Sequence, residues 1–235
     1  MEIRIGDKKD RISERHLLLV PNGDKGSEGK VYVWKKQALK IYNPYRTKKV
    51  LDKDTANLIA SLKTNRIIGL DEIVTNKKHQ MIGYTMPLIK DTINLFDGLP
   101  LIDKETLLTE IDLLIKDVVT YSEAFIEFND FGSYNTLLTK DGNIYFIDPG
   151  SYEKSELDIP LLEMKNMESF NWCWHAIISQ LLRINIKNPE DYKKIRNDFF
   201  SRWNKQSDLE YSKFLEKEME NTNNLDEYVL KLKRF

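Results

Sequence analysis

The chain has a single cysteine, Cys173, among its 235 residues. One thiol cannot form a disulfide within the chain, so the fold depends on a packed core rather than on cross-links. Histidine is scarce as well, and the spacing of His16, His79 and His175 does not match a zinc site. These shortages exclude a disulfide-rich secreted domain and a metal centre built on cysteine or histidine.

The sequence also lacks a long apolar run and an excess of charge of one sign. Residues 17–20 form a short apolar stretch after a charged segment, far below the roughly 20 residues that a membrane span needs. The net charge is −1 although 31% of the residues are charged, so no basic field favours nucleic acid. We therefore expect a cytoplasmic protein that binds neither nucleic acid nor a membrane and recognises its ligand at a local site.

Hydrophobic periodicity divides the chain into a β-rich first part and a helical second part. Short apolar runs bounded by turn residues indicate strands at 16–21, 30–34, 38–42, 70–75 and 80–89. Apolar residues at helical spacing indicate helices at 46–63, 103–125, 169–184, 189–203, 208–220 and 225–233. We predict a bilobal α+β fold. Residues 1–89 form an antiparallel sheet lobe with one helix, and residues 90–235 form a mainly helical lobe.

Polar residues flank a short hairpin in the second part. Two β-prone runs, 137–138 and 144–147, are separated by an Asp-Gly turn. A hairpin brings its ends together, so Asn135 and Asp148 should lie side by side, with Asp130 close to both. Carboxylate and amide oxygens are ligands that suit Mg²⁺. The alternative is an ordinary hairpin with solvated acidic ends.

The order of these residues, Asp130, then Asn135, then Asp148-Pro149-Gly150, resembles the catalytic loop and metal-binding turn of the protein-kinase-like superfamily. The resemblance implies that Asp130 is the catalytic base, that Asn135 and Asp148 bind Mg²⁺, and that ATP is the phosphate donor. The implied type is a compact, atypical, bacterial-type Ser/Thr protein kinase or a related small-molecule kinase.

Two stretches of the first part resemble nucleotide-binding motifs of the same superfamily. The glycine-rich loop is matched at Gly26, Gly29 and Val31, where the absence of a Cβ lets backbone N–H groups approach phosphate. Residues 38–42 resemble the strand that carries the phosphate-binding lysine, which implies that role for Lys40 and places Ala38 in the nucleotide pocket. A plain turn followed by a solvated lysine is the alternative.

Residues 83–89 resemble the last strand of the first lobe as it enters the hinge. The resemblance implies that Met86 lies at the back of the adenine pocket. The Pro87 carbonyl would accept from the adenine amino group, and the Ile89 N–H would donate to the ring. Proline at position 87 lacks only a donor that this arrangement does not use. The alternative is an edge strand that ends at the proline.

Several positions depart from the superfamily pattern. The helix at 46–63 has no glutamate to pair with Lys40, so Asp54 or Asp52 is the candidate substitute. Gly132 stands where Ser/Thr protein kinases have a lysine two residues after the catalytic aspartate. Pro149 replaces the phenylalanine whose packing switches protein kinases between states, which predicts that this switch is absent.

We expect an ATP- and Mg²⁺-dependent phosphotransferase that transfers the γ-phosphate to a hydroxyl of a protein or a small molecule. The alternative is a pseudokinase that kept the fold as a nucleotide-binding or protein-interaction module. The missing helix glutamate favours the pseudokinase, whereas retention of Asp130, Asn135 and Asp148 together favours the enzyme. A structural protein without nucleotide is a third possibility.

Overall fold

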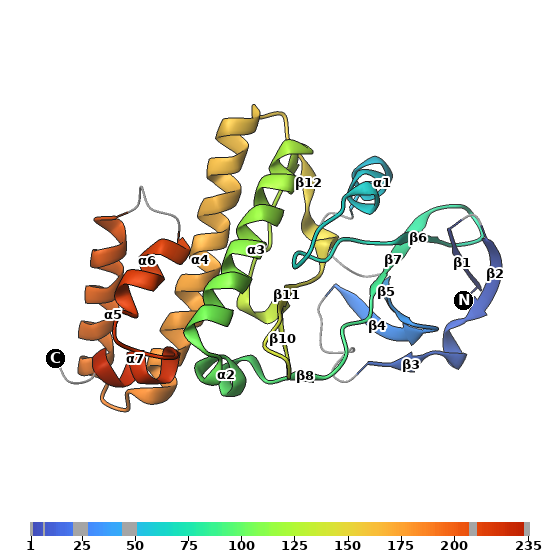
Figure 1. The fold of residues 1–235 in the computed structure, drawn as a ribbon. Helices are drawn as coiled ribbons and strands as arrows, with labels where there is room; N and C mark the ends of the chain where they lie inside the picture. The colour runs from blue at the N-terminus through green and yellow to red at the C-terminus, as the bar shows by residue number, and fades with distance from the viewer. Residues whose placement is uncertain (1, 7, 21–27, 44–50, 207–210, 233–235) are drawn as a thin grey trace.

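The computed structural model describes residues 2–6, 8–20, 28–43, 51–206 and 211–232. Figure 1 shows the N-terminal sheet at one end of the molecule and the last three helices at the other, with two long helices between them. Among the described residues, the helical half contains α2 (Leu95–Gly98), α3 (Lys104–Glu123), α4 (Ile159–Asn185), α5 (Pro189–Asn204), α6 (Tyr211–Glu218) and α7 (Leu225–Leu232). The predicted α+β class, with an antiparallel sheet first and mainly helices after it, is confirmed.

The N-terminal sheet is antiparallel, and its described part has seven strands in the order β2-β1-β6-β7-β5-β4-β3. Its strands are β1 (Glu2–Ile5), β2 (Lys8–Ser13), β3 (Leu18–Leu19), β4 (Gly29–Trp34), β5 (Gln37–Tyr42), β6 (Glu72–Thr75) and β7 (Met81–Pro87). The hairpin of β1 and β2 was not expected, because charged residues dominate that segment. Its signal was the alternation of Ile3 and Ile5, both of which are buried.

The two faces of the sheet have different neighbours. Leu39 and Ile41 of β5 pack with Ile3, Ile5 and Val74 in a small core of their own. Side chains alternate along a strand, so Ala38, Lys40 and Tyr42 point to the opposite face. Ala38 and Tyr42 there join the large core that includes α3 and α4. Strand alternation therefore directs Lys40 toward the helical half.

The helix expected at 46–63 is described as α1 (Lys53–Ser61), and residues 44–50 lie outside the described part. Asp52 is its N-cap, and the side chain accepts from the backbone N–H groups of Asp54 and Thr55 at 3.0 and 2.9 Å. A carboxylate at this position satisfies N–H groups that have no partner within the helix.

Each helix expected in the helical half is present over its described residues, but α4 begins early and the short α2 was not expected. Helix α3 begins at the N-cap Asp103, as its sequence indicated. Helix α4 begins at Ile159, ten residues before the predicted start at 169. Leu161 and Met164 in its first turns are exposed, so the apolar stripe that marks a buried helix is absent there.

The predicted hairpin is formed by β10 (Thr136–Thr139) and β11 (Ile144–Phe146), and β8 (Thr92–Ile93) pairs with β10 on its other side. A second small sheet joins β9 (Ile126–Glu127) to β12 (Glu153–Lys154). These two sheets flank the segments that lead into residue 130 and away from residue 148. They therefore set the positions of both.

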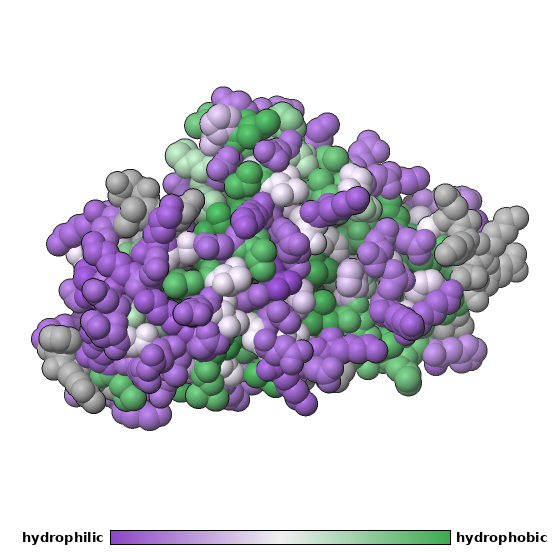
Figure 2. Space-filling view, viewed as in Figure 1, coloured by the Kyte–Doolittle hydropathy of each residue, from purple (hydrophilic) through white to green (hydrophobic). Residues whose placement is uncertain are grey.

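Hydrophilic residues cover most of the face shown in Figure 2, and a patch of apolar residues lies over the upper ends of α3 and α4. Within the described ranges, no helix is both long and apolar enough to cross a lipid bilayer.

Candidate functional site

An ion pair joins the sheet to the helical half. The Lys40 Nζ of β5 lies 2.5 Å from each carboxylate oxygen of Asp148, which follows β11. Only 3% of Lys40 is exposed, whereas the Asp148 side chain is 23% exposed. A buried ammonium needs a partner of opposite charge. The turn after β11 supplies that partner, Asp148, and β5 directs Lys40 toward it.

The backbone at Asp148 is in the left-handed region, with φ 73° and ψ 68°. This conformation costs a residue other than glycine about 1–2 kcal/mol, and such residues concentrate at functional sites. Asp148 Oδ1 accepts from the Gly150 N–H at 3.4 Å and from the Tyr84 hydroxyl. A Cβ on Gly150 would lie 3.1 Å from that oxygen and 3.3 Å from the hydroxyl. The Asp-x-Gly sequence thus leaves room for the carboxylate and its donors.

Charge and burial act in opposite directions on Asp148. Burial would raise the pKa of its carboxyl, but the Lys40 charge and the hydrogen bonds from Lys40, Tyr84 and Gly150 outweigh it, so the pKa is lowered. Burial, followed by the Asp148 charge, raises the pKa of Tyr84 well above its usual value. Asp148 is therefore an anion at neutral pH, and Tyr84 is a neutral hydrogen-bond donor.

The second carboxylate beside Lys40 belongs to Glu28, which the sequence analysis missed. Its Oε2 lies 3.1 Å from Nζ. The sequence suggests Asp52 or Asp54 as the partner of Lys40. In the structure Asp52 caps α1, and the Asp54 side chain is exposed. The superfamily pattern directed attention to the helix. Here the partner comes from residue 28, immediately before β4, and only the pairing of β4 with β5 brings it near Lys40.

Hydrogen bonds link Asn135, at the start of the hairpin, to the far end of the hairpin and to the loop before it. The Asn135 carbonyl accepts from the Ile147 N–H at 2.9 Å, which places Asn135 beside the turn of Asp148. Its side-chain Nδ2 donates to the Asp130 carbonyl at 3.2 Å. The Asp130 carboxylate in turn accepts a hydrogen bond from the Tyr134 hydroxyl. The structure therefore connects Asp130, Asn135 and Asp148 through a short series of contacts.

An aromatic stack and a buried asparagine hold the loop at 128–131. Phe131 stacks on Phe146 of β11 with ring centroids 4.3 Å apart, and Phe128 stacks on Phe131 at 4.9 Å. Asn166 of α4 is fully buried; its Oδ1 accepts from the Phe128 N–H at 3.0 Å, and its Nδ2 donates to the Ile126 carbonyl at 2.8 Å. Neither Asn166 nor the stack was anticipated from the sequence.

Two buried carboxylates of α3 fix the hairpin to the segment after α1. Asp117 accepts from the backbone N–H groups of residues 65–67, with the Ile67 bond at 2.8 Å. Glu110 accepts from the Arg66 guanidinium and from the Ile144 N–H of β11, the latter at 2.9 Å. Through these bonds, helix α3 fixes the position of β11 and therefore the position of Asp148, which follows β11.

The other predicted nucleotide-binding residues lie on neighbouring strands, except for Gly26, which falls outside the described residues. Val31 of β4 is opposite Lys40, and Ala38 of β5 is opposite Met86 of β7. Ala38 and Met86 are buried, and Pro87 is exposed at the end of β7. Gly29 begins β4, and Ile89 follows β7, where it packs against the large core. Except for Gly26, the structure gathers these residues on and beside three paired strands.

The oxygen donors of this site are of the chemical kind that Mg²⁺ takes. Asp148 supplies a carboxylate, and the Asn135 Nδ2–Asp130 bond leaves the Asn135 amide oxygen for other partners. Mg²⁺ is commonly held by one or two carboxylates together with substrate phosphates and water. No group of three or more acidic, histidine or cysteine side chains within the described residues forms a metal cage. Asn135 and Asp148 are therefore the residues that would hold Mg²⁺.

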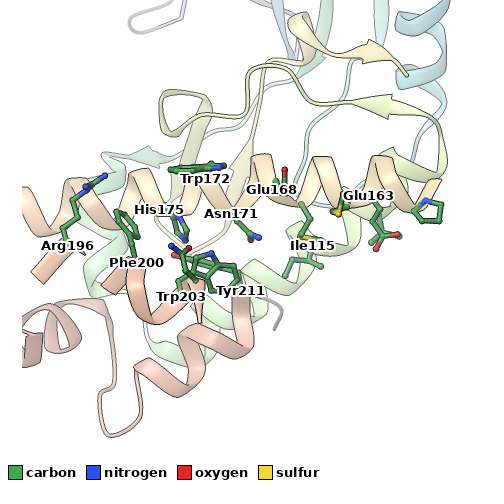
Figure 3. Close-up of a pocket in the computed structure, with 15 residues that line it drawn as sticks. Ile115, Glu163, Glu168, Asn171, Trp172, His175, Arg196, Phe200, Trp203 and Tyr211 are labelled. Carbon is green, nitrogen blue, oxygen red and sulfur yellow. The ribbon is translucent and has the colours of Figure 1, made fainter. Parts of the chain in front are cut away.

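A separate cavity of about 1060 Å³ lies between helices α3 to α6, and none of the residues above lines it (Figure 3). Its aromatic wall includes Trp172, His175, Phe200, Trp203 and Tyr211. Burial, followed by the charge of Arg196, lowers the pKa of His175 to about 4, so this imidazole is neutral at pH 7. The buried ion pair of Lys40 and Asp148 lies outside this cavity.

Comparison of the chain with models of known protein families finds no match. Comparison with curated proteins finds none either. What this site does is therefore inferred from its own geometry.

Proposed function

We propose that this chain is an ATP- and Mg²⁺-dependent phosphotransferase of the protein-kinase-like type. The observation that supports it most is the buried Lys40, which extends from the sheet to Asp148 in a left-handed turn beside Asn135. A buried ion pair contributes little net stability compared with an apolar pair of similar size. The strained, partly exposed Asp148 paired with a buried lysine is therefore better explained by a role in ligand binding than by a role in the stability of the fold.

Each residue has a distinct role in this proposal. Lys40 binds the α- and β-phosphates of ATP, exchanging its contact with Asp148 for phosphate oxygens. Asp148 and Asn135 hold Mg²⁺, which when bound neutralises charge on the phosphates. Gly29, Val31, Ala38, Met86, Pro87 and Ile89 form the nucleotide pocket. Asp130 orients the acceptor hydroxyl and takes its proton as general base.

The balance of charge supports the binding of a cation. Glu28 and Asp148 place two carboxylates around the single ammonium of Lys40. When Lys40 turns to phosphate, the charges of both carboxylates lose part of their compensation, and a divalent cation held by Asp148 and Asn135 would restore it. The acceptor hydroxyl belongs to a protein or a small molecule. The single buried thiol supports a cytoplasmic location.

The second candidate is a pseudokinase, that is, a nucleotide-binding or protein-interaction module. One observation favours it: Asp148 Oδ1 already accepts from Lys40, Tyr84 and the Gly150 N–H. An oxygen with three donors is less available to a metal ion. In this alternative, the ion pair of Lys40 and Asp148 would hold the sheet and the helical half together.

Two substitutions separate the candidates. Asp148→Asn removes the charge that holds Mg²⁺, so metal-dependent nucleotide binding and turnover should both fall. Asp130→Asn keeps the size but cannot accept the proton, so the rate should fall on the order of 10²–10⁴-fold with nucleotide affinity nearly unchanged. ATP turnover measures the rate. Thermal unfolding with ATP and Mg²⁺ measures binding, since ligand at about 100 times its Kd adds roughly 2.7 kcal/mol.

Asp141→Asn is the matched control, because it makes the same change in the exposed turn of the same hairpin. Its turnover and binding should equal those of the unaltered chain. Full turnover by Asp130→Asn would disprove the base assignment. ATP binding without transfer to protein, peptide or small-molecule acceptors, and without ATP hydrolysis, would establish the pseudokinase.

A further inference from the structure

The Tyr134 side chain is folded back onto the loop that carries the proposed base. Its hydroxyl donates a hydrogen bond to Asp130 Oδ1, although 71% of the residue is exposed. So exposed a ring gains little from burial, and hydrophobic packing does not explain its position. The hydrogen bond to the Asp130 carboxylate is the contact that accounts for the position of the ring.

Gly132 makes that position possible. A Cβ on Gly132 would lie 2.6 Å from Cε1 and 2.8 Å from Cζ of the Tyr134 ring. Both distances are too short for carbon atoms in contact, so any side chain at residue 132 would displace the ring. The glycine that stands where Ser/Thr protein kinases have a lysine therefore provides the space that the tyrosine ring occupies.

An acceptor hydroxyl and a general base must be within hydrogen-bonding reach before the proton can move. The Tyr134 hydroxyl meets this requirement with the carboxylate that we assign as base. The next residue, Asn135, is one of the two proposed metal ligands, and its Nδ2 bonds the Asp130 carbonyl. The phenol, the base and the metal ligand are thus held together within residues 130–135.

We propose that Tyr134 is a phosphate acceptor of the chain's own site and is phosphorylated within the same molecule. This inference rests on the proposed phosphotransferase function. The Tyr134 proton passes to the Asp130 carboxylate, and the phenolic oxygen forms a bond to the γ-phosphorus of ATP. The bond from that phosphorus to the oxygen bridging the β-phosphate breaks, and ADP leaves with the bonding electron pair. Asp130 later releases the proton to water.

The product has a physical consequence for the loop. A phosphotyrosine carries a charge of about −1.5 to −2 at neutral pH and would lie against the Asp130 carboxylate. Like charges repel, so the modified side chain should swing away from the loop into solvent. The modification would then expose Asp130 to an external hydroxyl.

The test incubates dephosphorylated protein with ATP and Mg²⁺ and follows intact mass, with peptide mapping to locate the phosphate. We expect one phosphate on Tyr134 and a rate constant that does not change with protein concentration. Tyr134→Phe should abolish this incorporation, and Gly132→Ala should reduce it by displacing the ring. Tyr192→Phe, the same change on α5, is the matched control and should incorporate phosphate at the unaltered rate. Asp148→Asn should lose this incorporation, which would show that the chain itself, and not a contaminating kinase, transfers the phosphate.

A second measurement does not depend on turnover. With ¹³C-labelled tyrosine and no nucleotide, Asp130→Asn should shift the Tyr134 ring signals and leave those of Tyr192 in place. An unshifted Tyr134 signal would overturn the inference.

The inference and the proposed function fail in different ways. Transfer to other hydroxyls or ATP hydrolysis, with Tyr134 unmodified, would overturn the inference and leave the phosphotransferase standing. Incorporation that rises with protein concentration would overturn transfer within one molecule. Absence of both ATP-dependent thermal stabilisation and transfer would overturn both proposals.

Discussion

At the scale of single residues, one cluster of charged groups surrounds Lys40 in a partly buried position. Lys40 is buried and pairs with the carboxylates of Glu28 and Asp148. The Asp148 backbone is left-handed, and its Oδ1 accepts a further hydrogen bond from the Tyr84 hydroxyl. Polar groups are expensive to bury unless they are satisfied. Removing the central cation should therefore be more costly than removing a surface lysine.

Lys40→Met should lower the free energy of unfolding at pH 7 by roughly 1–3 kcal/mol, because it leaves Glu28 and Asp148 without their cation. The Asp148 pKa is lowered in the folded state, so the stabilisation is present above about pH 4. It is lost as the pH falls through the lowered pKa and Asp148 takes up a proton. Urea unfolding at pH 7 and at pH 2 measures the difference.

The control for this prediction is Lys36→Met, which makes the same change at an exposed turn position. Surface substitutions usually alter stability by no more than about 0.5 kcal/mol. Equal losses for the two variants at pH 7 would show that Lys40 has no special role in stability.

At the scale of elements, helices α3 and α4 act as rigid supports for an irregular loop. Glu110 and Asp117 of α3 bind backbone N–H groups of β11 and of residues 65–67. Asn166 of α4 binds the backbone on both sides of Glu127, just before the loop of Asp130. A loop cannot satisfy its own backbone groups as a helix does, so buried side chains of neighbouring helices do it.

Asn166→Ala should destabilise the protein by about 1–3 kcal/mol, because the Phe128 N–H and the Ile126 carbonyl lose buried partners. It should also slow the proposed phosphotransfer with a smaller change in the proposed nucleotide binding, since the Asp130 loop is the part that loosens. Denaturant unfolding and turnover measure the two effects. Asn57→Ala, on the exposed face of α1, is the control and should change neither. An unchanged stability for Asn166→Ala would mean that water replaces the side chain.

At the scale of the whole molecule, a sheet and a helical unit share one large core. That core extends from Ala38 and Tyr42 of the sheet to Leu225 and Val229 of α7. The last helices pack through aromatic rings around His175. The centroid of its ring lies 4.8 Å from that of Phe200 and 5.6 Å from that of Trp203. A neutral imidazole in such surroundings makes global stability depend on pH.

The pKa of His175 is lowered to about 4 in the folded protein, against about 6.5 in the unfolded chain. Between these values the unfolded chain binds more protons, so the free energy of unfolding falls as the pH drops from 6.5 to 4. The largest loss from this group is about 3 kcal/mol. His175→Gln cannot titrate and should show a smaller decrease over that interval in urea unfolding.

His16→Gln is the control, because His16 is exposed. It should retain the pH dependence of the unaltered chain. If His175→Gln keeps the same dependence too, the imidazole is protonated inside the folded protein and the assignment of a neutral His175 is wrong.

The sequence by itself determined the elements whose signals are local. The stripe of α3, the Asp-Gly hairpin turn and the strands around Lys40 follow from periodicity and turn chemistry, and these gave the α+β class. The juxtaposition of Asn135 with the Asp148 turn also followed, because a hairpin must bring its ends together. The order of Asp130, Asn135 and Asp148 gave the hypothesis of function.

Only the tertiary structure decided the partners that are distant in sequence. Glu28, rather than Asp52 or Asp54, lies beside Lys40, because strand pairing and not helix position sets its neighbours. Asn166 and the stacking of Phe131 on Phe146 have no local signature, because each joins residues that are distant in sequence. The start of α4 escaped detection because its first turns bury no apolar stripe. Periodicity records which face of an element is buried, whereas the identity of the group across that face depends on the packing of the whole chain.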